Sequence, residues 1–171
     1  MHAETVIKLL KLFAANDSDV VVDGGWGVDA LLGRQTRSHG DLDIAISHKN
    51  VPKLRQLLTE KGFSDVLRDD TRDCNFVLGD RLENLVDVHS YTFDEQGNNI
   101  FGIEYLPEHF TGRGTIDGYS VKCISAEWSV KFHTGYELDE NDFADVSALC
   151  EYFNLLLPKE YDKFINKNQQ N

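Results

Sequence analysis

The chain has 171 residues with 17 basic and 29 acidic side chains, which gives a formal net charge of -12. Its length indicates one domain with at most a small appendage, and its 41% apolar and 27% charged residues exclude a disordered chain. The acidic balance argues against a duplex DNA-binding face, which needs a basic patch. It is typical of a protein that handles metal cations or basic small molecules.

Targeting and redox features are sparse. The N-terminus lacks a basic region before a long apolar run, and no stretch approaches the roughly 18 apolar residues of a membrane span, so we expect no signal peptide and no membrane partner. Cys74, Cys123 and Cys150 are widely spaced and form no zinc pattern. They are expected to be reduced core residues of a cytoplasmic protein.

The first part of the chain alternates helices and strands. Apolar residues at helical spacing predict a helix over residues 5–15, and Asp19 to Asp23 is a short buried-type strand. The Gly24-Gly25-Trp26-Gly27 segment is expected to form a turn before a short helix over 28–32, which Gly33 ends. A polar loop over 34–40 and a strand over 41–46 follow.

The remainder predicts strands and then helices. A helix is expected between Asn50 and Gly62, followed by strands near 63–67, 75–78 and 85–89 and a turn over 94–99. Asp117-Gly118 predicts a hairpin over 114–123. Helices are expected from Ser125 to about 133, from Asp139 or Asn141 to about 157, and after Pro158, with a frayed tail over 167–171. This order predicts an α+β domain with helices gathered at its C-terminal end.

A DxD pair at residues 41–43 is the first chemical feature. Because side chains alternate along a strand, Asp41 and Asp43 point to the same face. Two adjacent carboxylates repel unless a cation lies between them, and carboxylate oxygens suit Mg²⁺. A solvated pair at a strand start is the simpler alternative.

Gly24-Gly25 and Asp87 extend this feature. Glycines between a strand and a helix let backbone N–H groups approach a phosphate, although taken alone they are better explained by a tight turn with positive φ. Neither the GxxxxGK[ST] nor the GxGxxG fingerprint is present, which disfavours P-loop and Rossmann proteins. Asp87 interrupts an apolar strand, with His89 on the same face, so it either completes a three-carboxylate cluster or faces water on an edge strand.

Basic and acidic side chains near these motifs suggest substrate contacts. Arg37 could clamp a phosphate, and His39 could orient a carboxylate, or both could be ordinary loop residues. Lys131 could neutralise a triphosphate or be merely exposed. Residues 132–158 contain six acids and no Lys or Arg, which would form solvated faces or an acidic rim that attracts a basic substrate.

Taken in order, these motifs resemble the polymerase-β-like nucleotidyltransferase superfamily. Three segments are similar to the signature of lincosamide nucleotidyltransferases and, less closely, to that of 2''-aminoglycoside nucleotidyltransferases. They are Asp23-Gly-Gly-Trp-Gly-Val-Asp29, the residues that follow it through His39, and Asp41-Leu-Asp-Ile44. Cys123-Ile-Ser and Phe132-His-Thr-Gly-Tyr136 also resemble the lincosamide group. The resemblance covers residues 5–150 and is weak over 63–115 apart from Val86 to His89. The gap between the glycines and the DxD is longer than is usual in the superfamily, a feature of the antibiotic-modifying subgroup.

The resemblance implies a polymerase-β-like α+β fold with a mixed sheet. Residues 1–123 would form the nucleotidyltransferase domain, and residues 124–171 a helical part packed on it. It implies transfer of a nucleoside monophosphate from Mg²⁺-bound ATP or GTP to an antibiotic hydroxyl. Asp41 and Asp43 match the metal ligands, Asp87 matches the third acid, a general base or further ligand, and Gly24 and Gly25 match the phosphate-facing turn.

Several functions stay open at this point. The acceptor is expected to be a lincosamide, with an aminoglycoside, another small alcohol or a protein hydroxyl as alternatives. A second possibility is a non-catalytic minimal domain that binds a partner protein. Loss of Asp87 or of one DxD acid would favour that interpretation, but all three are present. A DxD phosphatase ranks low because a strand and a Gly-Gly turn precede the DxD. The chain is small for a closed substrate pocket, so a homodimer is expected to complete it.

Overall fold

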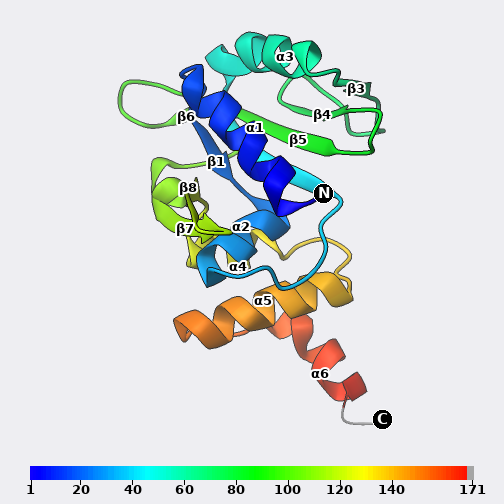
Figure 1. The fold of residues 1–171 in the computed structure, drawn as a ribbon. Coiled ribbons are helices and arrows are strands. Elements are labelled where there is room, and N and C mark those ends of the chain that lie inside the picture. The colour runs from blue at the N-terminus through cyan, green and yellow to red at the C-terminus, as the bar shows by residue number, and fades with distance from the viewer. Residues whose placement is uncertain (169–171) are drawn as a thin grey trace.

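The structure, a computed structural model, describes residues 1–168; residues 169–171 of the tail expected to fray lie outside them. An eight-stranded mixed sheet has the order β3-β4-β5-β2-β1-β8-β7, with β6 paired to β5 (Figure 1). The strands are β1 (Val20–Val22), β2 (Asp41–Ser47), β3 (Ser64–Val66), β4 (Asn75–Gly79), β5 (Leu85–Phe93), β6 (Asn99–Gly102), β7 (Gly112–Ile116) and β8 (Tyr119–Cys123). The helices are α1 (Ala3–Ala15), α2 (Gly24–Leu32), α3 (Val51–Glu60), α4 (Ala126–Phe132), α5 (Glu140–Phe153) and α6 (Asp162–Asn168), with short 3₁₀ turns at His48–Asn50, Pro107–Thr111 and Lys159–Tyr161.

Strand β2 holds the centre of the sheet. It pairs antiparallel with β1 and parallel with β5, and the parallel register sets Asp43 directly opposite Asp87. A parallel pair needs a crossover connection, which α3, β3 and β4 supply. The predicted hairpin is present as β7 and β8, and its Asp117-Gly118 turn has φ of 46° and 77°, the two positive values that a type I′ turn requires.

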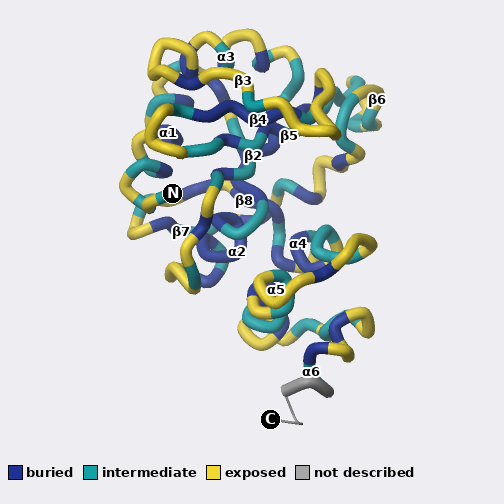
Figure 2. Tube along the Cα trace, turned by 90° about the vertical axis from the view of Figure 1, so that its right-hand side faces the viewer, coloured by how far each residue is buried: buried dark blue, intermediate teal, exposed yellow. Residues whose placement is uncertain are grey.

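The two faces of the sheet differ in what covers them. Alternate residues of β2 such as Leu42 and Ile44 join one core cluster with Leu9 of α1 and Leu54 of α3, so these helices cover one face. The opposite face is covered in part by a second cluster that includes Ala45, with partly buried Phe132 of α4 packed against it. Figure 2 shows the buried strands between these layers. The face away from α1 and α3 is therefore the one on which the odd-numbered residues of β2 lie.

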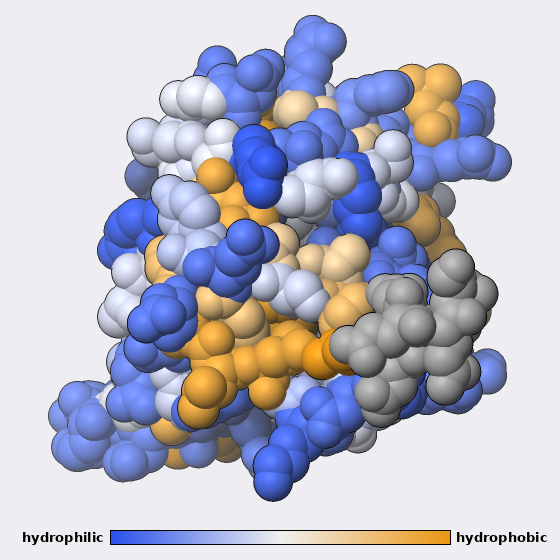
Figure 3. Space-filling model, turned by 90° about the horizontal axis from the view of Figure 1, so that it is seen from below, coloured by the Kyte–Doolittle hydropathy of each residue, from blue (hydrophilic) through white to orange (hydrophobic). Residues whose placement is uncertain are grey.

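The helices after β8 form a separate apolar cluster with α2. Val28 and Leu32 of α2 pack with Val130 of α4, Leu149 of α5 and Tyr161 before α6. At this end of the molecule, seen from below in Figure 3, apolar side chains form a band on the surface, and Phe153 and Leu156 are among the exposed apolar residues of this part of the chain. No helix within residues 1–168 is long and apolar enough to cross a membrane. The division at residue 123 stays a prediction.

The predicted mixed α+β architecture is confirmed, with several local differences. Helix α2 begins at Gly24 rather than after a four-residue turn, because the Asp23 carboxylate caps it by accepting the Gly24 N–H. Helix α5 ends at Phe153 rather than near 157, because Asn154 adopts a left-handed φ of 54°. Strand β5 runs four residues further than predicted, to Phe93, and β6 begins at Asn99, inside the expected turn. All three cysteines are buried and free, as predicted for the core.

Candidate active site

Three carboxylates meet on the sheet face away from α1 and α3. Asp41 and Asp43 alternate with buried Leu42 and Ile44 on β2, so both point to this face, as their spacing predicted. Asp87 comes from β5, directly opposite Asp43. One oxygen from each of the three carboxylates lies within 4.8 Å of the others, which is a separation that a shared cation can bridge.

The electrostatics of this cluster favour a cation. Burial raises the pKa of Asp43 well above its usual value, and the nearby carboxylates of Asp41, Asp23 and Asp87 raise it further. Burial also raises the pKa of Asp87, while His89 and Arg68 oppose that rise. The Oδ1 atom of Asp87 is buried and accepts no hydrogen bond from the described residues. Since Mg²⁺ prefers carboxylate oxygens, these residues fit a divalent metal.

Arg68 is a neighbour of Asp87 that the sequence did not reveal. Its guanidinium donates a hydrogen bond of 3.0 Å to Asp87 Oδ2, and the Nε2 atom of His89 lies 3.5 Å from Asp87 Oδ1. Arg68 belongs to the irregular segment between β3 and β4, where no periodicity predicts a position. His89 was expected on the Asp87 face from the strand period, and its position confirms that.

Asp23 and Tyr105 form a second polar pair beside the cluster. The Tyr105 hydroxyl donates to Asp23 Oδ2 at 2.9 Å, and Asp23 Oδ1 accepts the Gly24 N–H at 2.8 Å. Burial, followed by the charge of Asp23, raises the pKa of Tyr105 well above its usual value, so the phenol stays protonated and donates. Asp23 directly follows β1 and precedes the glycines, and this place between a buried strand and the glycines is the sequence signal that identifies it as a candidate site residue.

Each of the two glycines has a specific neighbour. Gly24 has a φ of +55°, and a Cβ there would overlap the Asp43 carboxylate. A Cβ at Gly25 would overlap the His39 ring. The Gly24 N–H is already bonded to Asp23, whereas the next two N–H groups of α2 have no hydrogen-bond partner within residues 1–168. The absence of a side chain at these two glycines thus allows the start of α2 to lie close to Asp43 on β2 and to His39.

Arg37 and His39 are engaged inside the protein. Two nitrogens of Arg37 bond both oxygens of Asp145 on α5, the shorter bond being 2.6 Å, and Asp145 is only 1% exposed. His39 is buried with its Nε2 atom 2.5 Å from Asp29 Oδ2, and Asp29 also accepts from Thr36. Asp145 is the one buried member of the acidic stretch, most of whose six acids were expected to be solvated. A role of Arg37 and His39 toward a nucleotide stays a prediction.

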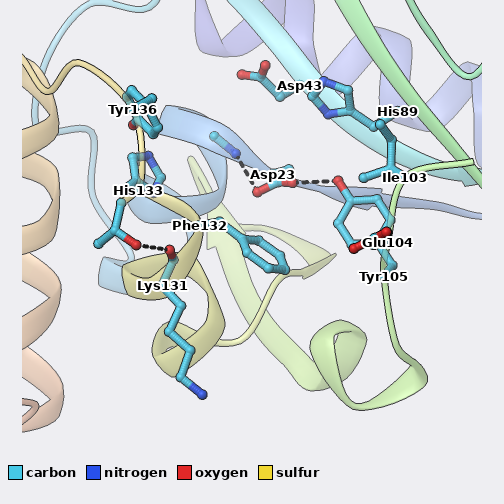
Figure 4. Close-up of a pocket in the computed structure, with 12 residues that line it drawn as sticks. Asp23, Asp43, His89, Ile103, Glu104, Tyr105, Lys131, Phe132, His133 and Tyr136 are labelled. Atoms are coloured by element: carbon cyan, nitrogen blue, oxygen red, sulfur yellow. Dashed lines mark hydrogen bonds between the residues drawn. The ribbon is translucent and has the colours of Figure 1, made fainter.

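A cavity of about 540 Å³ opens next to the carboxylates (Figure 4). Its lining includes Asp43 and Gly24, residues 103–105, and residues 131–134 with Tyr136. Lys131 belongs to this lining, but its ammonium lies 3.8 Å from the centre of the Trp128 ring and its side chain points away from the other residues drawn. The cavity adjoins both the metal-binding candidates and the N-terminus of α2, so it has the position of a substrate site.

Sequence comparison identifies relatives of the chain. The model of the aminoglycoside-2''-adenylyltransferase family matches residues 5–149. A lincosamide resistance protein of Staphylococcus haemolyticus is 29% identical over 146 residues, which cover 82% of this chain and 89% of that protein. Both relationships agree with the resemblance predicted from the Gly-Gly and DxD motifs.

Solved structures share the fold. The lincosamide antibiotic adenylyltransferase LnuA, in its lincomycin-bound crystal structure, has a TM-score of 0.74 and 26% identity, over 85% of this chain and 94% of that one. ANT(2'')-Ia, in complex with adenylyl-2''-tobramycin, has a TM-score of 0.72 at 18% identity, over 88% of each chain, and so supports the fold alone. The match over residues 5–149 shows that the chain belongs to the aminoglycoside-2''-adenylyltransferase family and is a nucleotidyltransferase.

Proposed function

We propose that this enzyme transfers a nucleoside monophosphate from Mg²⁺-bound ATP or GTP to a hydroxyl group of a lincosamide. The carboxylate cluster carries the proposal, because Asp41, Asp43 and Asp87 present oxygens within 4.8 Å of one another beside a substrate-sized cavity. An aminoglycoside remains the alternative acceptor, and the adenylyl-2''-tobramycin complex of ANT(2'')-Ia motivates it.

Asp41 and Asp43 on β2 would hold the metal, together with Asp87 on β5. When bound, Mg²⁺ would supply charge neutralisation for the triphosphate and for the developing oxygen charges. Burial and, after it, repulsion by the neighbouring carboxylates raise the pKa of Asp43, and a bound cation would offset both effects by attracting the carboxylates. No side chain within residues 1–168 donates a hydrogen bond to the Asp87 Oδ1 atom, so that oxygen is available.

Asp87 would also accept the proton of the acceptor hydroxyl. A general base must reach the proton that it removes, and Asp87 lies on the face of the sheet that adjoins the cavity. The raised pKa of Asp87, caused mainly by burial, makes it a stronger base than an exposed aspartate. Arg68 would hold the other oxygen of this carboxylate and so fix its orientation.

The N-terminus of α2 would bind the triphosphate. The two N–H groups that follow Gly24 are unpaired within the described chain and lie at the positive end of a nine-residue helix. Arg37, His39 and Lys131 were predicted as further nucleotide contacts. Because Arg37 bonds Asp145 on α5 and His39 bonds Asp29 on α2, we propose that they hold these helices to the strand that carries the DxD. Lys131 must leave the Trp128 ring to reach a phosphate.

The reaction can be tested by mass spectrometry. The purified protein would be incubated with Mg²⁺, an equal mixture of ATP and GTP, and a panel of lincosamides and aminoglycosides. We expect a lincosamide that gains one nucleoside monophosphate, with release of pyrophosphate. Asp41→Asn should give no product, whereas Asp117→Asn, in the distant hairpin turn, should keep full activity. Nucleotide binding without any drug adduct would instead favour a different acceptor or the partner-binding function.

A homodimer is proposed as the state that closes the cavity. The exposed apolar side chains after β8, among them Phe153 and Leu156, support an interface, since exposed apolar patches often mark contact surfaces. Light scattering should give twice the chain mass for the wild type and the chain mass for Leu156→Lys. A wild-type monomer that is fully active at dilution would contradict this part of the proposal.

A further inference from the structure

Glu104 lies on the wall of the cavity, in the segment between β6 and the 3₁₀ turn at Pro107. Its carboxylate is exposed and has no hydrogen-bond or ion-pair partner within residues 1–168. Figure 4 shows it beside Tyr105 at the end of the cavity away from Lys131 and Tyr136. An unpaired carboxylate on a cavity wall is suited to a cationic group of a ligand.

The backbone that carries Glu104 is held firmly. The Tyr105 N–H donates to the Ile103 carbonyl at 2.7 Å, which makes Glu104 the middle residue of a three-residue turn. The side-chain amide of Asn99 donates to the carbonyls of both Ile103 and Tyr105, at 2.7 and 3.2 Å. The hydroxyl of Tyr105 is bonded to Asp23. These contacts fix the position of Glu104 relative to the carboxylate cluster.

Glu104 is also the one carboxylate in this lining that neither accepts a hydrogen bond from the described residues nor belongs to the metal-binding cluster. The lining contains three acids: Asp23, Asp43 and Glu104. Asp43 belongs to the metal-binding cluster, and both oxygens of Asp23 already accept hydrogen bonds. The other charged residue, Lys131, carries the opposite charge. The cavity therefore offers one free negative group for an acceptor molecule.

The rest of this end of the cavity is apolar or aromatic. Ile103, Tyr105 and Phe132 line it, and the rings of Tyr105 and Phe132 are 5.8 Å apart. Burial of an aliphatic group against such a wall is favourable by about 25 cal/mol per Å². A ligand with one cationic amine and an apolar portion would satisfy both features, whereas a polycation would find a single free carboxylate in this lining.

We infer that Glu104 contributes to acceptor specificity by contacting the single cationic amine of an amphipathic alcohol, which favours such an acceptor over a polycationic one. The inference rests on the proposed function and narrows it, because lincosamides carry one basic amine and aminoglycosides carry several.

A charge-matched comparison tests the inference. The steady-state rates of the wild type, Glu104→Gln, Glu104→Asp and Glu108→Gln would be measured with lincomycin and with its N-demethyl, N-acetyl amide, in which the nitrogen has no charge. Glu108→Gln is the matched control, since Glu108 is an exposed neighbour outside the lining. Glu104→Gln should raise the KM for lincomycin about fivefold, the factor expected for loss of an exposed ion pair, with kcat and the KM for ATP unchanged.

Further results support or overturn the inference. Glu104→Asp should recover part of the loss, and neither glutamine variant should change the KM for the neutral amide. An equal loss on both acceptors, or transfer to tobramycin by the wild type as efficient as its transfer to lincomycin, would overturn the role of Glu104 and leave the proposed function standing. Absence of transfer from the wild type to every acceptor would overturn the proposed function itself.

Discussion

Replacement of Asp43 by asparagine should raise the stability of the metal-free protein while it abolishes activity. Asp43 has two acidic neighbours whose oxygens lie within 4.8 Å of its own. Burial and these neighbours raise its pKa, so at neutral pH the ionised carboxylate destabilises the fold. For such a group, the destabilisation disappears as the pH falls through the raised pKa. Asparagine keeps the shape and removes the charge, which relieves the repulsion at every pH above that point.

The size of the effect follows from Coulomb's law. Two unit charges 4.8 Å apart repel by about 0.9 kcal/mol in bulk water and by about 3.5 kcal/mol at an effective dielectric constant of 20. Asp43 lies between these limits, so Asp43→Asn should stabilise the metal-free protein by at least about 1 kcal/mol. In a chain of this size that corresponds to a rise in Tm of about 2–4 °C or more.

Thermal melts with and without Mg²⁺ separate this effect from a general change in packing. With chelator present, Asp43→Asn should melt above the wild type. At a Mg²⁺ concentration ten times the Kd, the wild type should gain about 1.4 kcal/mol, or about 3–6 °C, and the variant much less. Asp117→Asn is the control for an exposed aspartate and should follow the wild type in both conditions. A metal-free variant that melts below the wild type, or that gains as much from Mg²⁺, would refute the reasoning.

Three other substitutions address the base, the glycines and the pH profile. Asp87→Asn should lower kcat by about 10²–10⁴ in single-turnover assays, and retained activity would remove it from the proton transfer. Gly25→Ala should cost about 1–3 kcal/mol in urea unfolding because its Cβ meets His39, whereas Gly40→Ala, with no atom within 4 Å, should cost less than about 1 kcal/mol. Arg68→Ala should move the acid limb of the pH–rate profile to higher pH, because Arg68 lowers the pKa of Asp87 and activity needs that carboxylate ionised. An acid limb that stays at the same pH would show that Arg68 does not influence the general base.

Strand periodicity explains why the carboxylate cluster could be predicted. The two-residue period sets Asp41 and Asp43 on one face, and the same rule sets Asp87 and His89 together on β5. Glycine and aspartate patterns likewise predicted the β7–β8 hairpin from Asp117-Gly118. These features depend on local geometry, which residue type and spacing encode directly. The resemblance to known nucleotidyltransferases predicts that the two strands contribute to one site.

Residues that enter the site through tertiary contacts were not predictable in this way. Tyr105 reaches Asp23 across 82 positions of the chain, from a segment without regular structure. Arg68 likewise reaches Asp87 from an irregular segment, and Glu104 is presented by a turn that Asn99 closes. The start of α2 was misplaced because the capping role of Asp23 competes with the turn preference of the glycines.

The long gap between the glycines and the DxD has a structural explanation that connects these observations. The rest of α2 and the loop over 33–40 fill it, and two side chains of this loop reach buried carboxylates: His39 bonds Asp29 on α2, and Arg37 bonds Asp145 on α5. Because Asp145 is 1% exposed and Arg37 supplies its ion pair, the loop ties the C-terminal helices to the strand that carries the DxD. Arg37→Ala should therefore destabilise the chain by about 3–5 kcal/mol, because it leaves the buried charge of Asp145 on α5 without a partner. The same substitution at an exposed loop arginine, Arg81→Ala, should cost far less. Urea unfolding of Arg37→Ala and Arg81→Ala measures this difference. Equal losses of unfolding free energy would show that the loop over 33–40 does not stabilise the attachment of the C-terminal helices.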